Sequence, residues 1–482
     1  MCVTFTNMFR SNALRIIALL FIFNPANAST PLKTIFKGNI PQFVNNGVDP
    51  GSPLFLTPLL EAGKIEEARN LSVVGMLEGT SIKSYAGFFT VNKQYDSNMF
   101  FWFIPAKENP VDAPVVLWLQ GGPGGSSLFG LFVENGPFVI SKDQKLSNRK
   151  ITWQNKYSML YIDNPVGTGF SFTKDEAGYA RNETAVGNDL YSALLQFFQV
   201  YYEYQKNDFY ATGESYAGKY VPAVSYTIHK ENPRAKVKIN LKGMAIGDGL
   251  CDPESMFPAY GDFMYETGQL DENQRDYVNS QVDIASQYIQ QKKWKDCLQI
   301  FDTLLNGDIT PYPSFYYNAT GSKDYYNFLR LEEPEEFSYY NSYLALGEVR
   351  HAIHVGNLTY NDGSKVEHYL LEDICQSVKP WVIELLNNDY KAMFYNGQLD
   401  IIVANPLTQR FLAKLEWKRA AEYRKAERTI WKINNGTDVA GYVRAVGPGK
   451  GTMFQVMVRG AGHIAPYDQP ERLYDMIVNF IG

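Results

Sequence analysis

Three residues have the types and the order of a hydrolytic triad, namely Ser215, Asp400 and His463. Ser215 lies within Gly213-Glu-Ser-Tyr-Ala-Gly218, directly after an expected strand and directly before an expected helix, which is the setting of a nucleophile elbow. A serine hydroxyl is a weak nucleophile at neutral pH and needs a histidine base that a carboxylate holds in position. Asp400 and His463 each follow an expected strand and a glycine turn. This order predicts acyl-group chemistry at the carboxyl edge of a sheet.

The short serine motif has alternatives. Ala217 stands where the strict G-x-S-x-G pattern has its second glycine, and a match of this length also occurs at surface serines. The other histidines lie within a polar helix or an irregular central region, and these are His229, His351, His354 and His368. A single histidine is more often structural or solvated than catalytic. His463 is favoured because it occupies a glycine turn at the expected sheet edge.

Strands and helices that alternate along the chain are expected to position these residues. Apolar runs predict strands buried on both faces at 114–119 and 158–162, and further strands are predicted at 209–212, 241–246, 391–395 and 453–458. The helical spacing of apolar residues predicts helices at 183–204 and 216–230. Repeated β-α units indicate an α/β protein with a central, mainly parallel sheet flanked by helices. An antiparallel pair of strands is expected within 85–103.

The region from about 250 to 375 has a different pattern. Its part at 269–305 is polar and helical, and the following 308–327 is rich in Pro, Tyr and Gly. The region contains no repeat and no linker long enough to separate it from the rest. We therefore expect one domain over 29–482, in which this region is a helical insertion that forms a cap over the active site.

Composition argues against several classes of protein. The chain has 482 residues, is 45% hydrophobic, and carries a net charge of −6 with a pI near 5.6. The basic residues of 418–432 alternate with Glu422 and Glu427, as in a solvated helix, so nucleic acid is not an expected partner. Zinc-ligand spacings such as C-x-x-C or H-E-x-x-H do not occur, and no metal or cofactor is predicted.

The N-terminus has the pattern of a signal peptide. Arg10 and Arg15 precede an apolar run at 16–23, and Pro25-Ala-Asn-Ala28 contains the small-x-small form of a cleavage site. A membrane anchor is the alternative, but the run is far shorter than the roughly 20 residues of a spanning helix, and no later segment is long enough. We expect a signal peptide at 1–28, cleavage after Ala28, and a secreted or lysosomal/vacuolar protein.

Sequons and cysteines are compatible with the secretory pathway. Five N-x-S/T sequons follow the signal peptide, at Asn70, Asn182, Asn318, Asn357 and Asn435. Cys2 lies in the expected signal peptide, which leaves Cys251, Cys297 and Cys375. In an oxidising compartment these three thiols predict one disulfide and one free cysteine, and the sequence does not decide the pairing.

Five blocks of sequence occur in an order that is specific to one family. The blocks are Trp118-Leu-Gln-Gly-Gly-Pro-Gly-Gly-Ser-Ser127, Asp163-Asn-Pro-Val-Gly-Thr-Gly-Phe-Ser171, Gly213-Glu-Ser-Tyr-Ala-Gly-Lys-Tyr-Val-Pro222, Tyr395-Asn-Gly-Gln-Leu-Asp400 and Gly460-Ala-Gly-His-Ile-Ala-Pro466. The chain resembles the serine carboxypeptidase family over about 85–482, and within it the vitellogenic carboxypeptidase-like branch. The resemblance implies an α/β-hydrolase fold and hydrolysis of the C-terminal peptide bond through an acyl-enzyme.

The resemblance also implies roles for further residues. The backbone N–H groups of Gly122 and Tyr216 would form the oxyanion hole, with a contribution on the order of 3 kcal/mol for each donor. The free carboxylate of the substrate would be bound by Gln120, Gly121, Glu134 and Glu214. Two carboxyls that lie close together cannot both ionise readily, so one keeps a proton to donate to that carboxylate. An acidic working pH is expected for this reason.

The sequence departs from the family at three positions. Gln120 replaces the usual Asn and is longer by one methylene, and Gly125 replaces a frequent Cys. Ala404 replaces an Asn, with Asn405 one place later, which puts a hydrogen bond to Asp400 in question. The pocket for the departing residue would be apolar and would favour hydrophobic C-terminal residues. The residues of this pocket are Phe129, Val133, Val403 and Ile464.

Two other functions share these features. Acyltransferases of the family use the same triad and pass the acyl group to an alcohol, and the triad motifs do not separate them from peptidases. A non-catalytic storage or binding protein could also retain the fold. The partners of the favoured function are peptides or proteins with a free C-terminus, and a homodimer is compatible with the sequence.

Overall fold

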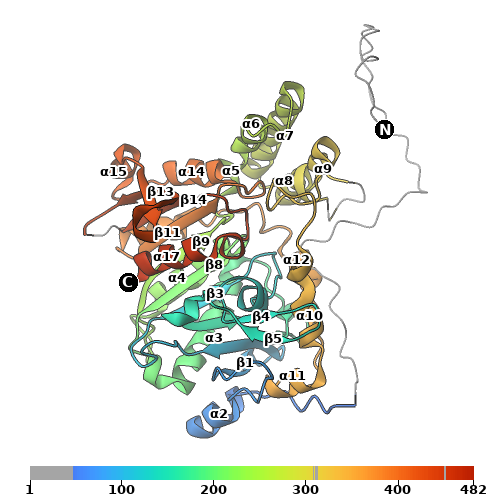
Figure 1. Ribbon diagram of the computed structural model, residues 1–482, viewed down its shortest axis with the longest axis vertical. Helices are drawn as coiled ribbons and strands as arrows, with labels where there is room; N and C mark the ends of the chain where they lie inside the picture. The colour runs from blue at the N-terminus through green and yellow to red at the C-terminus, as the bar shows by residue number, and fades with distance from the viewer. Residues whose placement is uncertain (1–46, 308, 310–312, 450–451) are drawn as a thin grey trace, which may run out of the picture.

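A ten-stranded sheet forms the centre of the molecule, in the order β1-β2-β6-β3-β8-β9-β11-β14-β13-β12 (Figure 1). The computed structural model describes residues 47–482 except 308, 310–312 and 450–451, so the predicted signal peptide lies outside the described residues. The six central strands are parallel, and they are β6 (Ser158–Ile162), β3 (Val115–Leu119), β8 (Phe209–Glu214), β9 (Leu241–Gly247), β11 (Lys391–Gly397) and β14 (Met453–Val458). All six of these predicted strands are confirmed.

Helices cover both faces of the central strands. Phe209 of β8 contacts Phe198 of α3 (Glu183–Val200), whereas the next residue, Tyr210, contacts Phe480 of α17 (Pro470–Ile481). Because successive side chains of a strand point to opposite faces, α3 and α17 lie on opposite sides of the sheet. Helix α4 (Ala217–Glu231) packs beside α3. This double cover explains why the central strands are apolar without alternation.

Helix α3 begins where the sequence predicts and ends early. Asn182 is its N-cap, and the side-chain oxygen accepts a hydrogen bond from the Ala185 N–H at 3.0 Å. The helix stops at Val200 and continues as a single 3₁₀ turn at Tyr202–Tyr204. The apolar face is buried against the sheet and α4, at roughly 1.5–3 kcal/mol for each large side chain.

Antiparallel strands close both edges of the sheet. The predicted pair within 85–103 is present as β1 (Tyr85–Asn92) and β2 (Ser97–Ile104). At the other edge, the expectation of a solvated helix over 418–432 is wrong beyond Lys425. A short helix, α15 (Ala420–Lys425), is followed by β12 (Thr429–Ile433), which pairs with β13 (Asp438–Val446). An edge strand with an exposed face accepts the same alternation of charge as a solvated helix.

The segment from the end of β9 to about residue 375 is helical, as the sequence predicts. Its helices are α5 (Pro253–Met256), α6 (Tyr260–Glu266), α7 (Glu272–Gln290), α8 (Trp294–Phe301), α9 (Phe315–Thr320), α10 (Tyr339–Leu344), α11 (Gly347–Ala352) and α12 (Ser364–Leu370). Figure 1 shows α6 to α9 beyond one end of the sheet and α10 to α12 along one side of the molecule. A capping box of Asp271 and Gln274 fixes the start of α7.

The remaining elements are short and connect these layers. They are α1 (Thr57–Glu61), α2 (Ile65–Leu71), α13 (Lys379–Asn387), α14 (Asn405–Ala413), α16 (Ala465–Asp468), β4 (Phe138–Ile140), β5 (Leu146–Asn148), β7 (Thr168–Gly169) and β10 (Asn361–Asp362). Among the helices of the described residues, none combines the length and the apolar character needed to cross a membrane.

The cysteines differ from the sequence prediction. Cys251, Cys297 and Cys375 are all buried as free thiols, so the predicted disulfide is not formed in this structure. Burial first, and then the neighbouring thiol of Cys297, raise the pKa of Cys375 well above its usual value. All three thiols therefore act as small apolar groups within the core.

Candidate active site

The turn at Ser215 joins β8 to α4 in a strained conformation. Ser215 has a φ of +63°, its N–H donates to the Gly247 carbonyl at 2.9 Å, and its carbonyl accepts from the Leu250 N–H at 3.0 Å. A Cβ at Gly213 would lie 2.4 Å from the Leu119 carbonyl oxygen and 2.8 Å from the Ala217 Cβ. Glycine is therefore required before the serine, whereas the methyl group of Ala217 fits after it. The predicted strand, sharp turn and helix are confirmed.

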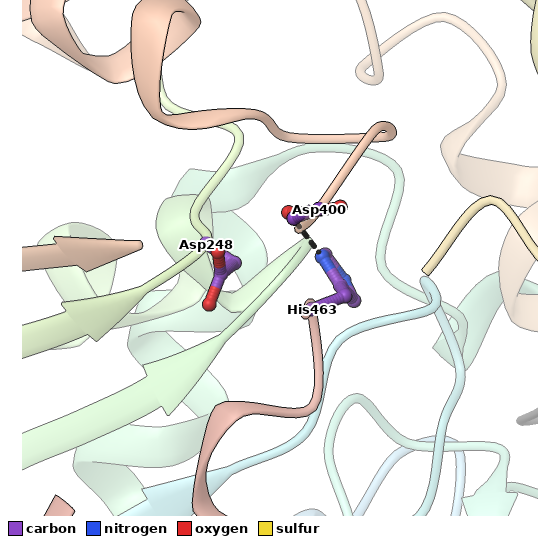
Figure 2. A group of neighbouring side chains, drawn as sticks. All are labelled: Asp248, Asp400 and His463. Carbon is purple, nitrogen blue, oxygen red and sulfur yellow. Dashed lines mark hydrogen bonds and ion pairs between the residues drawn. The ribbon is translucent and has the colours of Figure 1, made fainter. Parts of the chain in front are cut away.

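His463 and Asp400 meet at the same edge of the sheet (Figure 2). The His463 Nδ1 lies 2.8 Å from the Asp400 Oδ2, and both side chains are fully buried. The His463 N–H donates to the Tyr326 carbonyl at 2.7 Å, and the Tyr326 ring packs on the imidazole at 5.0 Å between centroids. The Nε2 atom of His463 has no hydrogen-bond partner among the described residues. This ring nitrogen is therefore free to act on a reacting group.

The environment of His463 has opposing effects on its basicity. Burial lowers the pKa of His463, whereas the Asp400 carboxylate raises it by its charge and its hydrogen bond, and Glu214 adds to this second effect. The net result is a raised pKa.

Strands β8, β9, β11 and β14 are neighbours in the sheet, so the turn of Ser215 ends at the edge that carries Asp400 and His463.

Asp400 receives no hydrogen bond from the side chain of residue 404 or 405, the position at which the sequence departs from the family. Its Oδ2 accepts the Val403 N–H at 3.2 Å, Ala404 offers no polar side chain, and the Asn405 Nδ2 makes no hydrogen bond to Asp400 among the described residues. A buried carboxyl that the sequence analysis missed, Asp248, lies beside Asp400 instead (Figure 2). An Asp-Gly pair after a strand is also typical of a turn, so the sequence alone gives no distinguishing signal for Asp248.

Two backbone N–H groups have no internal acceptor in the described part of the chain, one in the glycine loop after β3 and one in the turn of Ser215. Neither Gly122 nor Tyr216 donates a hydrogen bond from its N–H within the described residues. A Cβ at Gly121 would lie 2.5 Å from the Tyr216 nitrogen and 2.6 Å from the Ser215 Cβ. The glycine loop therefore approaches the serine so closely that residue 121 must be glycine.

A buried cluster holds the side chain of Tyr216. The Tyr216 hydroxyl donates to the Asp373 Oδ2 at 2.9 Å, and the Lys219 ammonium lies 3.1 Å from the same oxygen. Burial raises the pKa of the adjacent Glu183 well above its usual value, and the Asp373 charge adds to this effect. No sequence pattern indicates this cluster, because Glu183 lies on α3, Lys219 on α4 and Asp373 in the loop after α12.

Glu134, Glu214 and Gln120 form a buried polar group next to the serine. The Gln120 Nε2 donates to the Glu214 Oε1 at 2.7 Å, and the Trp118 Nε1 donates to the Gln120 Oε1 at 3.0 Å. Burial, followed by the Glu214 charge, raises the pKa of Glu134 well above its usual value. Burial also raises the pKa of Glu214, to about 7. The longer side chain of Gln120 thus spans from Trp118 to the acid pair, whose protons are retained at acidic pH.

The four residues of the predicted side-chain pocket are buried. Phe129 packs against Phe337 and Tyr340 of the inserted segment, with ring centroids at 5.4 and 6.2 Å. Val403 lies three residues after Asp400, Ile464 directly follows His463, and Val133 belongs to the same short helix as Glu134. The pocket itself stays a prediction.

All five asparagines of the sequons, Asn70, Asn182, Asn318, Asn357 and Asn435, are exposed.

Comparisons with known proteins identify the family. The family model "Serine carboxypeptidase" matches residues 75–482. The human protein "Probable serine carboxypeptidase CPVL" is 58% identical over 434 residues, which cover 90% of each chain. The "Vitellogenic carboxypeptidase" of Aedes aegypti is 44% identical over 434 residues, which cover 89% of this chain and 90% of the mosquito protein.

A solved structure supports the fold. The crystal structure of a prohormone-processing carboxypeptidase of Saccharomyces cerevisiae, Kex1, aligns with a TM-score of 0.73 at 24% identity, over 85% of this chain and 96% of the yeast chain. The predicted α/β-hydrolase fold and the predicted vitellogenic-like branch are confirmed. The chain therefore belongs to the serine carboxypeptidase family and is a serine-type carboxypeptidase.

Proposed function

We propose that Ser215, His463 and Asp400 are the catalytic triad of this carboxypeptidase. The observation that carries the proposal is the 2.8 Å contact of His463 with Asp400, which leaves Nε2 without a partner at the edge where β8 ends in the strained Ser215 turn. The Ser215 hydroxyl attacks the last peptide carbonyl, and the His463 Nε2 accepts its proton. The leaving amino acid takes this proton, and water then hydrolyses the acyl-enzyme.

The developing negative charge is stabilised by the N–H groups of Gly122 and Tyr216. Their support is that neither donates a hydrogen bond to another described residue, while the Gly121 loop approaches the Ser215 turn closely. Preorganised donors of this kind contribute on the order of 3 kcal/mol each to the transition state. Asp373 acts indirectly, because it receives the hydrogen bond of the Tyr216 hydroxyl and so restrains the residue that carries one of the donors.

The free carboxylate of the substrate is bound by Glu134, Glu214, Gln120 and the Gly121 N–H. The support is the raised pKa of both acids, because a protonated carboxyl can donate a hydrogen bond to a carboxylate and an ionised one repels it. This requirement makes the enzyme an exopeptidase with an acidic working pH. Phe129, Val133, Val403 and Ile464 then favour a hydrophobic residue at the C-terminus.

The mature protein is a single domain over 29–482 that passes through the secretory pathway to the exterior or to a lysosome or vacuole. The proposal is supported by the signal-like sequence at 1–28 and by five exposed sequons. The insertion acts as a cap, which is supported by the contact of Tyr326 with His463 and of Phe337 with Phe129.

The release of free amino acids from N-blocked dipeptides tests the activity and the triad together. Ser215→Ala should lower kcat/KM by at least about 10⁴-fold, because the remaining groups cannot supply a nucleophile. Ser225→Ala is a matched control, since this serine is also buried, lies on α4, and has no assigned role. Peptidase activity retained by Ser215→Ala would rule out the proposed triad.

The same assay separates the two alternative functions. An acyltransferase would transfer the acyl group to an added alcohol faster than to water, so ester would form in preference to free acid. A non-catalytic protein would release no amino acid, and Ser215 would not be labelled by a fluorophosphonate. Labelling of wild type but not of Ser215→Ala, together with amino-acid release, is the expected result.

A further inference from the structure

Asp248 is a buried carboxyl next to Asp400 and His463. It directly follows β9 and has a φ of +44°. Its N–H donates to the Tyr395 carbonyl at 2.7 Å, and its Oδ1 accepts the Gly397 N–H at 2.9 Å. These two bonds fix the side chain against β11. Figure 2 shows Asp248 coming from the end of β9 to the same space as Asp400 and His463.

Two oxygen atoms at this place lack a donor. The Oδ2 of Asp248 and the Oδ1 of Asp400 are buried and have no hydrogen-bond partner among the described residues. Ligand atoms of Asp248, Asp400 and His463 all lie within 4.8 Å of one another. Two ionised carboxylates at this separation in a buried site would repel strongly. A single proton between them satisfies both oxygens, because one carboxyl then donates and the other accepts.

The donors around the two carboxyls decide which of them holds the proton. Asp400 accepts hydrogen bonds from the His463 Nδ1 and the Val403 N–H, which stabilise its ionised form. Asp248 accepts from the Gly397 N–H. Burial, followed by the charge of Asp400, raises the pKa of Asp248 well above its usual value. The proton therefore belongs to Asp248, and Asp400 is the acceptor.

We propose that Asp248 is a positioning residue, whose protonated carboxyl donates a hydrogen bond to Asp400 and orients that carboxylate toward the His463 imidazole. The inference rests on the proposed triad. It assigns to Asp248 the support that Ala404 cannot give and that the Asn405 Nδ2 does not give, since the donors to Asp400 among the described residues are Val403 and His463. The contacts of Asp248 are with β11 and with Asp400, so its contribution is to the geometry and the charge of the pair formed by Asp400 and His463.

The surrounding charges make this arrangement dependent on pH. The titratable groups that face Asp248 are Glu214 from β8, Tyr395 from β11, and Asp400 and His463 from the loops after β11 and β14. Loss of the Asp248 proton at high pH places a second negative charge beside Asp400 and removes the hydrogen bond. The imidazole is then held less firmly, and kcat should fall on the alkaline side of the pH profile.

Two substitutions at Asp248 test the proposal. Asp248→Ala removes the donor and should lower kcat about tenfold or more at acidic pH, with KM changed by less than about twofold. Asp248→Asn keeps an N–H donor for Asp400 and an acceptor for Gly397 but cannot ionise. It should keep kcat within about threefold of wild type, and the alkaline fall of kcat that wild type shows should be lost.

A matched control is Asp189→Asn, which removes another acid with a raised pKa, of about 6, on the remote helix α3. Its pH profile of kcat should equal that of wild type. An Asp248→Ala variant with wild-type kcat and pH profile would overturn the proposal. If Asp248→Ala does not fold, as judged by circular dichroism, an unchanged alkaline limb in Asp248→Asn would overturn it instead.

The three side chains are also of types that bind cations, so one arm of the experiment measures kcat after EDTA and after added Zn²⁺. Independence of kcat from both is expected, because the His463 Nδ1 is already bonded to Asp400. A requirement for Zn²⁺ that Asp248→Asn abolishes would overturn the positioning role in favour of a metal site.

Ser215→Ala, assayed in parallel, separates the hypothesis of the triad from the hypothesis of the positioning role of Asp248. Activity in that variant refutes the triad, whereas its inactivity beside a fully active Asp248→Ala refutes only the role of Asp248.

Discussion

Two pairs of buried carboxyls lie near the same serine and differ in what surrounds them. Glu214 accepts a hydrogen bond from the Gln120 amide, and burial raises the pKa of both Glu134 and Glu214, so this pair is neutral at acidic pH. Asp400 instead receives an imidazole N–H, and its neighbour Asp248 keeps the proton. The hydrogen-bond donors around a buried carboxyl therefore decide its protonation state, and with it whether the carboxyl binds an anion or holds a histidine base.

The largest expected effect comes from changing the carboxyl that must be ionised. Asp400→Asn should lower kcat by about 10⁴-fold, because an amide cannot hold His463 in the required tautomer or stabilise the imidazolium that forms. KM should change little, since Asp400 is not part of the proposed carboxylate site. Steady-state hydrolysis of an N-blocked dipeptide measures both constants.

Glu134→Gln is the matched change in the other pair, and it should act mainly on KM. Retention of more than about a tenth of wild-type kcat by Asp400→Asn would mean that the two pairs do not differ as proposed. Correct folding of both variants is checked by circular dichroism.

The next effect concerns the pH dependence of substrate binding. Burial raises the pKa of Glu214 to about 7, and loss of its proton above that pH places a negative charge opposite the substrate carboxylate. KM for a peptide should therefore rise by up to roughly tenfold per pH unit above 7. Glu214→Gln cannot ionise, so its KM should be flat over the same range, although higher than that of wild type at acidic pH.

A substrate with a C-terminal amide is the control for this effect, because it lacks the charge that an ionised Glu214 repels. Its KM should not rise with pH in wild type. A parallel rise for the amide and the free acid would show that another group titrates. The acidic working pH has a lower limit, because kcat should fall once His463 gains a proton, and the raised pKa of His463 brings this limit closer to neutral pH.

Much of this comparison follows from the sequence, and the missing part has a physical reason. Apolar runs such as Val115–Leu119 are buried on both faces and predict strands directly. The elbow at Ser215 is a local motif, and Asp400 and His463 follow strands that end at the same edge. Asp248 is different, because its importance depends on Asp400, which is remote in the chain and reaches it only through the pairing of β9 with β11.

The other predictions that were wrong or missing have their physical causes in solvent exposure and in side-chain contacts. Strand β12 (Thr429–Ile433) is mostly exposed, so its charged residues follow solvent and do not distinguish a strand from a helix. The second contact of Gln120, with Trp118, depends on side-chain directions in the folded site. The three cysteines stay free because of where the fold buries each thiol, and the number of cysteines in the sequence does not predict this.

The stability of the folded chain should depend on pH through the protons that its buried acids retain. Glu214 has an ordinary pKa of 4.5 and a folded value of about 7, so between these values the folded chain keeps a proton that the unfolded chain loses. Stability from such a group is full below 4.5 and is lost as pH rises through about 7. Asp163, with a pKa raised by burial to about 7, acts in the same direction. The Tm should be lower at about pH 8 than at about pH 5, by on the order of 5 °C.

Thermal unfolding at both values measures this difference, and Glu214→Gln should reduce it, because the variant has one fewer such proton. A Tm that rises toward pH 8 would show that the buried acids are ionised in the folded chain. The neutral character of the pair formed by Glu134 and Glu214 would then be wrong as well.

The smallest expected effect tests why this chain has a longer amide at residue 120. Gln120 bonds to both Trp118 and Glu214, and an Asn is one methylene too short to keep both contacts. Gln120→Asn should raise KM about fivefold, since one hydrogen bond is worth about 1 kcal/mol, and should leave kcat nearly unchanged. Gln154→Asn is the matched control, because this buried glutamine bonds to the Pro105 carbonyl, outside the proposed site. Equal changes in KM for the two variants would remove Gln120 from the carboxylate site, whereas a change confined to Gln120→Asn would mean that the longer amide is what couples the acid pair to Trp118.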